Sequence, residues 1–309
     1  MSELLYLARD EVARLLPPPD EQFELVDATY RALAAGRVEL PPKPGVHPRP
    51  DAFLHAMPAH LRDDDVVALK WVAGYPANPE RGLPYITALI VVNDAETGLP
   101  LAVMDGAEIT AARTAAASGV CVRRFAPPGW RRAAILGCGE QGRRHARLLA
   151  ATNPDVRIRA YDPLRERTEA MPGPVEAMPG PREAVEGAEV VVTAGPIVAE
   201  PESPLAPGWL GERWLALPLD FDLYFAAATV AAADLFLADD VDQFEYYRSL
   251  GHFRGWPRPA GGVGGALAGG DSPARVLCCN LGVGALDAAF AARVLERARE
   301  EGAGTPLRL

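Results

Sequence analysis

The sequence predicts an α/β protein in which a doubly wound parallel sheet accompanies an α+β domain with a mainly antiparallel sheet. Two observations predict this fold class. Between residues 51 and 106, strand-like runs follow one another with only turns between them, which is typical of antiparallel sheets. After a Pro-Pro-Gly break at 127–129, apolar runs alternate with helical stretches, which is typical of a parallel sheet.

The part before this break is expected to form helices and then strands. Residues 1 to about 50 look helical and then extended, with a helix near 20–36 that ends at Gly36, because the following prolines prevent its continuation. Strand-like runs cover 51–59, 66–75, 85–94 and 100–106, and an alanine-rich helix covers 107–126. We expect residues 1–118 to form one domain, completed by the C-terminal segment 284–309 with its helix at 284–301.

Residues 119–283 are expected to form a second domain around the parallel sheet. Apolar runs cover 131–137, 156–162, 189–195, 213–218 and 233–238. The segment EAMPGP occurs at 169–174 and again at 176–181 and is expected to be loop, and the glycine-rich stretch 259–265 is expected to be flexible. The acidic stretch 239–247 matches no calcium loop, so we expect the start of a helix there.

Composition excludes several classes of protein. With 31 basic and 41 acidic residues the net charge is −10, which argues against nucleic acid or an anionic membrane as a partner. No apolar run reaches the roughly 20 residues of a membrane-spanning helix, and the N-terminal segment carries early acids rather than a secretory signal. The four cysteines show no CxxC or metal-binding spacing, so we expect a cytoplasmic protein without a metal.

Lysine is rare in this chain, because only Lys43 and Lys70 among the 31 basic residues are lysines. Such a bias towards arginine makes the remaining lysines candidates for a function that needs a compact ammonium with an adjustable pKa. The alternative is that both lysines remain by chance.

A glycine-rich loop predicts a dinucleotide site in a Rossmann-type domain. Gly137, Gly139 and Gly142 directly follow an apolar strand and open a helix. Glycines in this pattern allow a tight turn and let backbone N–H groups approach a pyrophosphate at the helix N-terminus. The alternative is a glycine-rich turn that binds nothing.

Asp162 indicates which dinucleotide binds. It ends the next strand, 20 residues after Gly142, where a carboxylate accepts hydrogen bonds from the ribose hydroxyls. Its charge would repel a 2′-phosphate, so we expect NAD rather than NADP, although Arg165 and Arg167 lie nearby. The expected cofactor contacts in this part of the chain are Gly137, Gly139, Glu140, Gln141, Gly142, Asp162 and Thr193.

Four segments together resemble the ornithine cyclodeaminase/mu-crystallin family. They are LKWV at 69–72, NPERGLP at 78–84, AVMDG with ITAARTAAAS between 102 and 118, and ILGCGEQG at 135–142. The resemblance runs over essentially the whole chain. It implies a homodimer with a substrate-binding and dimerisation domain (1–118 and 284–309) and an NAD-binding Rossmann domain (119–283). The family includes ornithine cyclodeaminases, alanine dehydrogenases, opine-type and ketimine reductases, and the thyroid-hormone-binding mu-crystallin.

The resemblance also assigns roles to residues. Lys70 matches the active-site lysine, and Arg113 matches the arginine that holds the substrate carboxylate, for which a guanidinium is well suited. Asp220, at the carboxyl end of a strand, matches the catalytic aspartate that handles a proton, with Asp222 as the alternative. Two further positions, Asn280 and Gly282, are implied as cofactor contacts near the nicotinamide.

Three departures from the family pattern concern the substrate. Lys43 stands where the family usually has an arginine, and His55 stands where ornithine cyclodeaminases have a glutamate. The ProGlyLys segment that follows the catalytic aspartate in those enzymes is also missing after Asp220. Contacts for the distal amine of ornithine are therefore in doubt, and a bulkier or more aromatic amine or imine is expected. His55 is as compatible with a core histidine as with a substrate contact.

These observations predict an NAD-dependent enzyme that transfers a hydride at Cα of a small amino or imino acid, by oxidative deamination, cyclodeamination or imine reduction. Lys43, His55, Lys70 and Arg113 would contact the substrate, and Lys70 and Asp220 would be catalytic. Two alternatives remain: a non-catalytic mu-crystallin-like protein that binds a nucleotide and a small ligand, and an accessory subunit of an amine-metabolising enzyme.

Overall fold

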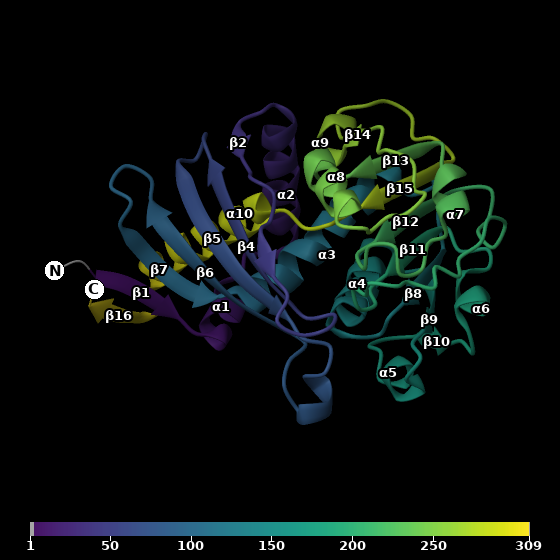
Figure 1. The fold of residues 1–309 in the computed structure, drawn as a ribbon, viewed down its shortest axis with the longest axis horizontal. Coiled ribbons are helices and arrows are strands. Elements are labelled where there is room, and N and C mark those ends of the chain that lie inside the picture. Colours follow the sequence, from purple (N-terminus) through teal and green to yellow (C-terminus); the bar gives the residue numbers. More distant parts are fainter. Residues whose placement is uncertain (1–2, 309) are drawn as a thin grey trace. The chain divides into compact units, whose positions relative to one another are not determined.

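The computed structural model describes residues 3–308, and the chain divides into two compact units (Figure 1). The first unit extends to Ala116 and resumes at Gly282, and the second unit extends from Ala117 to Leu281. The N-terminal boundary falls inside the long helix α3 (Gly106–Phe125). No helix within residues 3–308 is long and apolar enough to cross a membrane.

A mostly antiparallel sheet forms the first unit, with the strand order β16-β1-β7-β6-β5-β4-β2 and β3 beside β4. The strands are β1 (Glu3–Leu7), β2 (Val38–Glu39), β3 (Gly45–Val46), β4 (Phe53–Leu61), β5 (Val66–Gly74), β6 (Ile86–Asp94), β7 (Pro100–Asp105) and β16 (Thr305–Arg308). The four strands expected from the sequence are β4 to β7, and they are confirmed to be antiparallel neighbours.

The N-terminal residues differ from the expected helical pattern. Residues 3–7 form β1, which pairs in parallel with β7 and antiparallel with β16. Leu4 and Leu7 are buried, and helix begins only at α1 (Arg9–Leu15). A run of five residues is too short for its periodicity to distinguish a strand from a helix, so partners distant in sequence decided the outcome.

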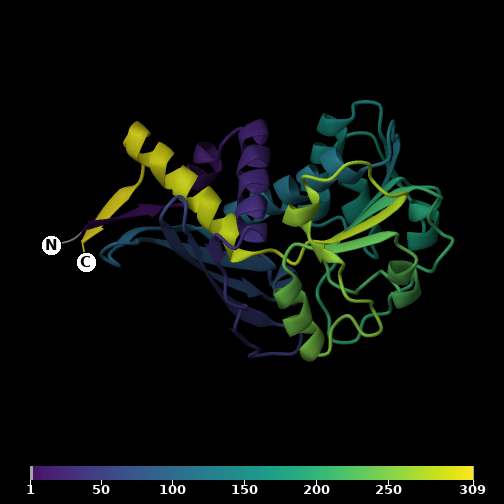
Figure 2. The same ribbon diagram turned by 90° about the horizontal axis from the view of Figure 1, so that it is seen from above.

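Helices cover one face of this sheet. Figure 2 shows α2 (Pro19–Ala34) and α10 (Gly284–Glu301) on the same side of it, and α10 packs on β4, β5 and β6. The short helix η1 (Pro79–Arg81) lies between β5 and β6 in the sequence. The helices expected at 20–36, 107–126 and 284–301 are confirmed as α2, α3 and α10.

The register of the sheet places Lys70 on this covered face. Lys70 lies between Met57 of β4 and Ile90 of β6, and Ile90 pairs in turn with Met104 of β7. All four side chains are buried. A lysine in an otherwise apolar row must find a partner on the helices above it, because a buried charge without one is costly.

The second unit is a fully parallel sheet with the order β10-β9-β8-β11-β12-β15-β13-β14. Its strands are β8 (Arg132–Leu136), β9 (Arg157–Tyr161), β10 (Val175–Ala177), β11 (Val190–Thr193), β12 (Trp214–Pro218), β13 (Leu235–Ala238), β14 (Gly261–Gly262) and β15 (Arg275–Cys279). Its other helices are α4 (Glu140–Thr152), α5 (Arg165–Glu169), α6 (Pro181–Val185), α7 (Ala227–Ala231), α8 (Val241–Ser249) and α9 (Val263–Ala266). The doubly wound fold is thereby confirmed.

The strand order reverses between β8 and β11, and the glycine-rich loop follows β8 at this point. In open parallel sheets, ligands bind outside the carboxyl ends of the strands where the order reverses. The fold of the second unit therefore places residues 137–142 at the position where a dinucleotide would bind.

Two segments expected to be irregular contain regular structure. The second EAMPGP copy contributes to β10, which pairs with β9, and the glycine-rich stretch contributes β14 and α9. Both strands lie at the edges of the sheet, where a neighbouring strand supplies hydrogen bonds that local sequence does not reveal. The acidic stretch behaves as expected, because the side chain of Asp240 caps α8 by accepting from the backbone N–H of Gln243 at 2.6 Å.

His145 fixes α4 within the second unit. One ring nitrogen lies 2.8 Å from the carbonyl oxygen of Gln141, and the other lies 2.8 Å from the hydroxyl of Ser118 in α3. The side chain is fully buried, and burial lowers the pKa of His145 to about 4, against the opposing effect of its hydrogen bond to Gln141. The folded protein therefore holds a neutral imidazole at this position.

This pKa predicts that the stability of the second unit depends on pH. Between pH 6.5 and 4 the unfolded chain binds a proton at His145 that the folded chain does not, so the free energy of unfolding falls as the pH falls. We expect a loss of about 2 kcal/mol between pH 7.5 and 5 from this residue. Urea unfolding of the wild type and of His145→Gln at both values measures it, and an equal pH dependence in both would contradict it.

Candidate functional site

A buried cluster of three charged side chains lies in the first unit. Lys70 of β5, Arg113 of α3 and Asp287 of α10 are 1%, 6% and 1% exposed. Nζ of Lys70 lies 2.7 Å from Oδ2 of Asp287, and Nε of Arg113 donates to Oδ1 at 3.0 Å. Nζ of Lys70 also donates to the hydroxyl of Thr110 at 3.2 Å. One carboxylate thus pairs with two cations from two other elements, and the cluster keeps a net positive charge.

Burial and charge oppose each other at these groups. Burial has the largest effect on Lys70 and lowers its pKa to about 7; Asp287 raises this pKa, whereas Arg113 and Lys43 lower it. Burial also disfavours ionisation of Asp287, but Arg113 and Lys70 outweigh it and hold the pKa of this carboxyl below its usual range. Lys70 can therefore gain or lose a proton near neutral pH while Asp287 stays ionised.

Gly282 lies beside Lys43 and Arg113. Its carbonyl accepts a hydrogen bond from Nζ of Lys43 at 3.0 Å, and Lys43 is 6% exposed. Its φ is +80°, and a Cβ there would lie 2.7 Å from Nη1 and 2.8 Å from Nη2 of Arg113. Gly282, which the sequence associates with the cofactor, thus lies against two residues expected to bind the substrate carboxylate.

His55 lies in the same unit and is electrostatically coupled to these cations. The ring is 9% exposed and stacks on Phe53 with 4.4 Å between the centroids. Burial, together with the charges of Lys43 and Lys70, lowers the pKa of His55 to about 3. The imidazole is therefore neutral at neutral pH and can donate and accept hydrogen bonds without adding charge to the cluster.

The glycine-rich loop of the second unit has the backbone that a dinucleotide site requires. Gly137 has a φ of +94°, and a Cβ there would lie 2.5 Å from the carbonyl oxygen of Ala194. A Cβ at Gly142 would lie 2.1 Å from the carbonyl oxygen of Gly137, so this close packing of α4 on the loop requires glycine. Beside Gly139, the N-cap of α4, no atom of the described chain lies within 4 Å of a Cβ position. The loop fits a pyrophosphate.

Glu140 and Gln141 of the loop bond within their own helix. The carboxylate of Glu140 accepts a hydrogen bond from Arg144 at 2.7 Å, and the carbonyl of Gln141 faces His145. Their placement at the start of α4 leaves backbone N–H groups of the first turn as the groups suited to a pyrophosphate.

Asp162 bonds to the loop through its carboxylate. Oδ2 accepts from the backbone N–H of Cys138 at 2.8 Å, and Oδ1 accepts from that of Leu164 at 2.9 Å. Both bonds fix the carboxylate at the end of β9 while leaving acceptor capacity on each oxygen. Arg165, the nearby cation, donates to Glu169 at 2.8 Å.

Asp220 is a buried carboxylate in the second unit. It is 1% exposed, accepts from the hydroxyl of Thr193 at 2.6 Å, and accepts from the backbone N–H of Gly195 at 2.8 Å. Burial raises the pKa of Asp220 to about 7 despite these hydrogen bonds. Such a carboxyl can release or accept a proton near neutral pH, which a general acid–base group must do. Thr193, expected to contact the cofactor, orients this carboxylate.

Asp222 points to a different part of the second unit. Its Oδ2 accepts from the backbone N–H of Phe253 at 2.7 Å, and its Oδ1 lies 3.8 Å from Nδ1 of His252. Between the two aspartates, Phe221 has a φ of +61°, which is a strained conformation for a bulky residue. This geometry turns Asp220 and Asp222 towards different partners and favours Asp220 as the proton-handling residue.

Asn280 has an acceptor without a partner in the described chain. Its side chain is 5% exposed; the amide nitrogen donates to Sγ of Cys121 at 3.9 Å, while Oδ1 bonds to no group within residues 3–308. A buried carbonyl oxygen of this kind is costly unless a ligand supplies a donor. The carboxamide of a nicotinamide is a group of the required type.

Asp287 is the functional candidate that sequence reasoning missed. Its acidic side chain stands in the apolar stretch at the start of α10, where neighbouring residues are mainly alanine and leucine. A lone carboxylate in such a stretch is a usable signal, because a buried charge requires a partner. Which partner it has depends on the packing of α10 on β5, which the sequence does not reveal.

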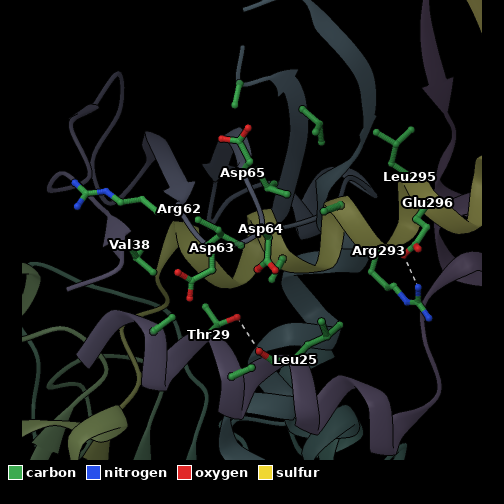
Figure 3. A pocket seen from close by; sticks show the side chains of 18 of the residues that line it. Leu25, Thr29, Val38, Arg62, Asp63, Asp64, Asp65, Arg293, Leu295 and Glu296 are labelled. Carbon is green, nitrogen blue, oxygen red and sulfur yellow. Dashed lines mark hydrogen bonds and ion pairs between the residues drawn. The ribbon is translucent and has the colours of Figure 1, made fainter. Parts of the chain in front are cut away.

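A hollow of about 980 Å³ in the first unit lies apart from this chemistry (Figure 3). Thr29 and Leu25 of α2 line it, opposite the Asp63–Asp65 turn and the outer part of α10 around Arg293. None of the residues expected at the substrate or cofactor sites lines it. We therefore assign the candidate site by its chemistry rather than by this hollow.

Comparison with known proteins identifies the same family that the sequence motifs resemble. The model of the ornithine cyclodeaminase/mu-crystallin family matches residues 6–212. The nodulation efficiency protein NfeD of Rhizobium meliloti is 34% identical over 311 residues, which cover 97% of each chain.

Solved structures share the fold over the whole chain. The Δ1-pyrroline-2-carboxylate reductase of Thermococcus litoralis, solved with NADH and L-proline, is 25% identical with a TM-score of 0.86 and covers 98% of this chain and 99% of its own. An archaeal alanine dehydrogenase dimer with bound NAD is 26% identical with a TM-score of 0.85 and covers 100% of both chains.

The contact between Gly282 and Arg113 predicts a specific sensitivity to a methyl group. Gly282→Ala combines a strained φ of +80° with a collision against the guanidinium, and we expect it to destabilise the protein by about 1–3 kcal/mol. Gly302→Ala is the control, since its φ is +64° but no described atom lies within 4 Å of its Cβ position. Urea unfolding of both variants checks this, and equal destabilisation would show that the guanidinium moves aside freely.

Proposed function

Because the chain belongs to the ornithine cyclodeaminase/mu-crystallin family, we propose that it is an NAD-dependent enzyme acting by hydride transfer at Cα of a small amino or imino acid. The observation that carries this proposal is the buried cluster of Lys70, Arg113 and Asp287. It concentrates cations in a form suited to an α-carboxylate. The reaction would be an oxidative deamination, a cyclodeamination or an imine reduction.

The predicted residues divide the work of this proposal among substrate binding, cofactor binding and proton transfer. Lys70 and Arg113 bind the substrate carboxylate, with Lys43 as a further cation beside Gly282. Residues 137–142, Asp162 and Asn280 hold NAD, which when bound supplies the acceptor or donor of a hydride. Asp220, held by Thr193, takes or gives the proton on nitrogen or on an attacking water.

A second candidate function is a binding protein of the mu-crystallin type, and a third is an accessory subunit of an amine-metabolising enzyme. Binding a nucleotide and a small ligand would require the glycine-rich loop and the cations of the first unit. It would not require Asp220, whose pKa of about 7 suits proton transfer. The presence of Asp220 therefore favours an enzyme over a binding protein.

An assay with a panel of amino acids tests the proposal. The protein is incubated with NAD and each compound while reduced nicotinamide is followed by absorbance and released ammonia is measured separately. Ammonia without net NADH indicates cyclodeamination, and NADH with ammonia indicates a dehydrogenase. Lys70→Arg and Asp220→Asn should abolish turnover while leaving NAD affinity within a few-fold, since neither lies in the glycine-rich loop. If the wild-type protein turns over none of the compounds with any cofactor, that result would favour the binding protein.

Asp162 predicts a preference for NAD over NADP. Its carboxylate is fixed by the N–H groups of Cys138 and Leu164, so it cannot easily move away from a 2′-phosphate. We expect NAD to bind more tightly by about 1–3 kcal/mol, roughly ten- to a hundredfold. Fluorescence titration with both reduced cofactors measures this. NADP binding at least as tight would contradict it and point to Arg165, which Arg165→Ala would then test.

L-Ornithine is predicted to be a poor substrate. Its distal ammonium would meet the neutral ring of His55 near Lys43 and Lys70, without the glutamate expected of ornithine cyclodeaminases. A buried unpaired ammonium should lower kcat/KM by about a hundredfold or more relative to apolar or aromatic amines, imines and amino acids. Steady-state kinetics with ornithine, alanine, phenylalanine and cyclic imines measure kcat/KM for each compound. Ornithine as the best substrate would overturn this expectation.

We also propose that the protein is a homodimer that uses the uncovered face of the first sheet. Leu69, Trp71 and Leu89 on this face are 36%, 43% and 48% exposed, and Trp71 pairs with Leu89 across β5 and β6. Contiguous exposed apolar side chains of this size mark an interface. A second copy is the partner because the archaeal alanine dehydrogenase of the same fold is a dimer.

A charge on this face should separate the subunits. We expect Leu89→Glu to convert a dimer into a monomer, because burying a carboxylate in an apolar interface without a partner is unfavourable. Leu99→Glu, at a residue 48% exposed in the turn before β7, should leave the dimer intact. Sedimentation velocity at micromolar concentration measures both. A monomeric wild type would refute the dimer, and dissociation by both variants would refute the assigned face.

The cysteines support a cytoplasmic location for this enzyme. Cys121, Cys138, Cys278 and Cys279 are all free and buried. Proteins that keep several free thiols are typical of a reducing compartment.

A further inference from the structure

We propose that Asp287 is the positioning residue of the substrate site: its carboxylate keeps Lys70 in the ammonium form and fixes Arg113, so that both cations face a substrate carboxylate. This inference rests on the proposed function, which supplies the substrate. Asp287 itself would touch neither the reacting carbon nor the cofactor, and its effect would pass through the two cations.

The geometry gives each carboxylate oxygen one cation. Oδ2 lies 2.7 Å from Nζ of Lys70, and Oδ1 accepts from Nε of Arg113 at 3.0 Å. Arg113 uses only Nε for this bond, so its terminal nitrogens Nη1 and Nη2 are turned towards Gly282, where no Cβ covers them. A guanidinium held by Nε presents its remaining N–H groups in a fixed direction.

The charges around Lys70 explain why a carboxylate is needed here. Arg113 and Thr110 face it from α3, Asp287 faces it from α10, Lys43 acts on it from the segment before β3, and His55 of β4 is neutral. Within residues 3–308, Asp287 is the carboxylate that contacts Lys70. Without it, a fully buried lysine would lie near two other cations and would lose its proton at a lower pH, so that it would be uncharged at neutral pH.

Stability alone is a weak reason to keep this ion pair. Burying an aspartate, a lysine and an arginine costs desolvation energy that the ion pairs offset only in part, and apolar residues of similar volume often serve as well. The apolar row around Lys70, formed by Met57, Ile90 and Met104, shows that the surrounding layer is otherwise built from such residues. The charged cluster is therefore better explained by the need for cations.

The rarity of lysine permits a direct test. The chain contains only Lys43 and Lys70, so protein labelled with ¹³C,¹⁵N-lysine gives two lysine side-chain signals in a ¹H–¹³C spectrum. Lys43→Met assigns them. The ¹³Cε shift of each lysine is then followed from pH 5 to 10, which reports protonation without requiring a substrate or turnover.

We expect the signal of Lys70 to titrate near pH 7 in the wild type. Asp287→Asn should lower the midpoint by about one to three pH units, because an opposite charge at contact distance is removed. Asp287→Glu should restore it to within about half a unit of the wild type. Glu108→Gln is the matched control: Glu108 is 8% exposed in the same unit and pairs with Arg9, so its loss should leave Lys70 unchanged.

Kinetics extend the test to the substrate. For the best compound of the amino-acid panel, Asp287→Asn should raise KM about tenfold or more with a smaller change in kcat, and the defect should shrink at lower pH as Lys70 regains its proton. A structural role alone would not produce a defect that lower pH repairs. An unchanged Lys70 midpoint in Asp287→Asn, or an equal shift in Glu108→Gln, would overturn the proposal.

The outcomes remain distinguishable from failure of the proposed function. If no compound is turned over, the lysine titrations still decide whether Asp287 controls the charge of Lys70. If Asp287→Asn does not fold, the proposal is tested with the lysine titrations of Asp287→Glu and of the wild type. A wild-type Lys70 that is already neutral at pH 5 would refute the proposal.

Discussion

Charges buried in one apolar layer are tolerable only if each has a partner of opposite charge, and the first unit pairs Lys70 and Arg113 with the single carboxylate of Asp287. The strand register puts Lys70 between Met57 and Ile90, where the sheet offers it no anion. The packing of α10 on β5 brings Asp287 to it, and α3 adds Arg113. The site therefore exists only when the C-terminal helix closes over a sheet built from the N-terminal part of the chain.

The second unit stabilises its buried carboxylate differently. Asp220 has no cation at contact distance among the described residues and depends on the hydroxyl of Thr193 and the N–H of Gly195. The strained backbone of Phe221 is held by a cluster of aromatic rings that includes Tyr247 and Phe253. Strain of this kind persists only when the surrounding packing determines it, so the aromatic cluster supports the orientation of Asp220.

Much of the fold and of the candidate site could be predicted from the sequence, for identifiable reasons. Strands β4 to β7 and helices α2, α3, α4 and α10 have strong local periodicity and clear ends, and the glycine-rich loop has a steric requirement visible in three residues. β1 and β10 were missed because their partners lie far away in the chain or at a sheet edge. Asp287 was missed because its role depends on helix packing, and Thr193 proved to orient Asp220, a relation that only the parallel neighbours β11 and β12 create.

Burial moves the pKa values of the two key groups to the same region from opposite sides. The pKa of Lys70 falls from 10.5 to about 7, and the pKa of Asp220 rises from 3.8 to about 7. Their partners nevertheless give them different responses to a ligand. The charge of Lys70 depends on nearby ions, so the arrival of a substrate carboxylate stabilises its ammonium form and suits it to binding. Asp220 is held by neutral donors that leave its proton exchangeable, which suits it to proton transfer. The division proposed here between a binding cation and a proton-handling carboxyl thus rests on what surrounds each group rather than on its residue type alone.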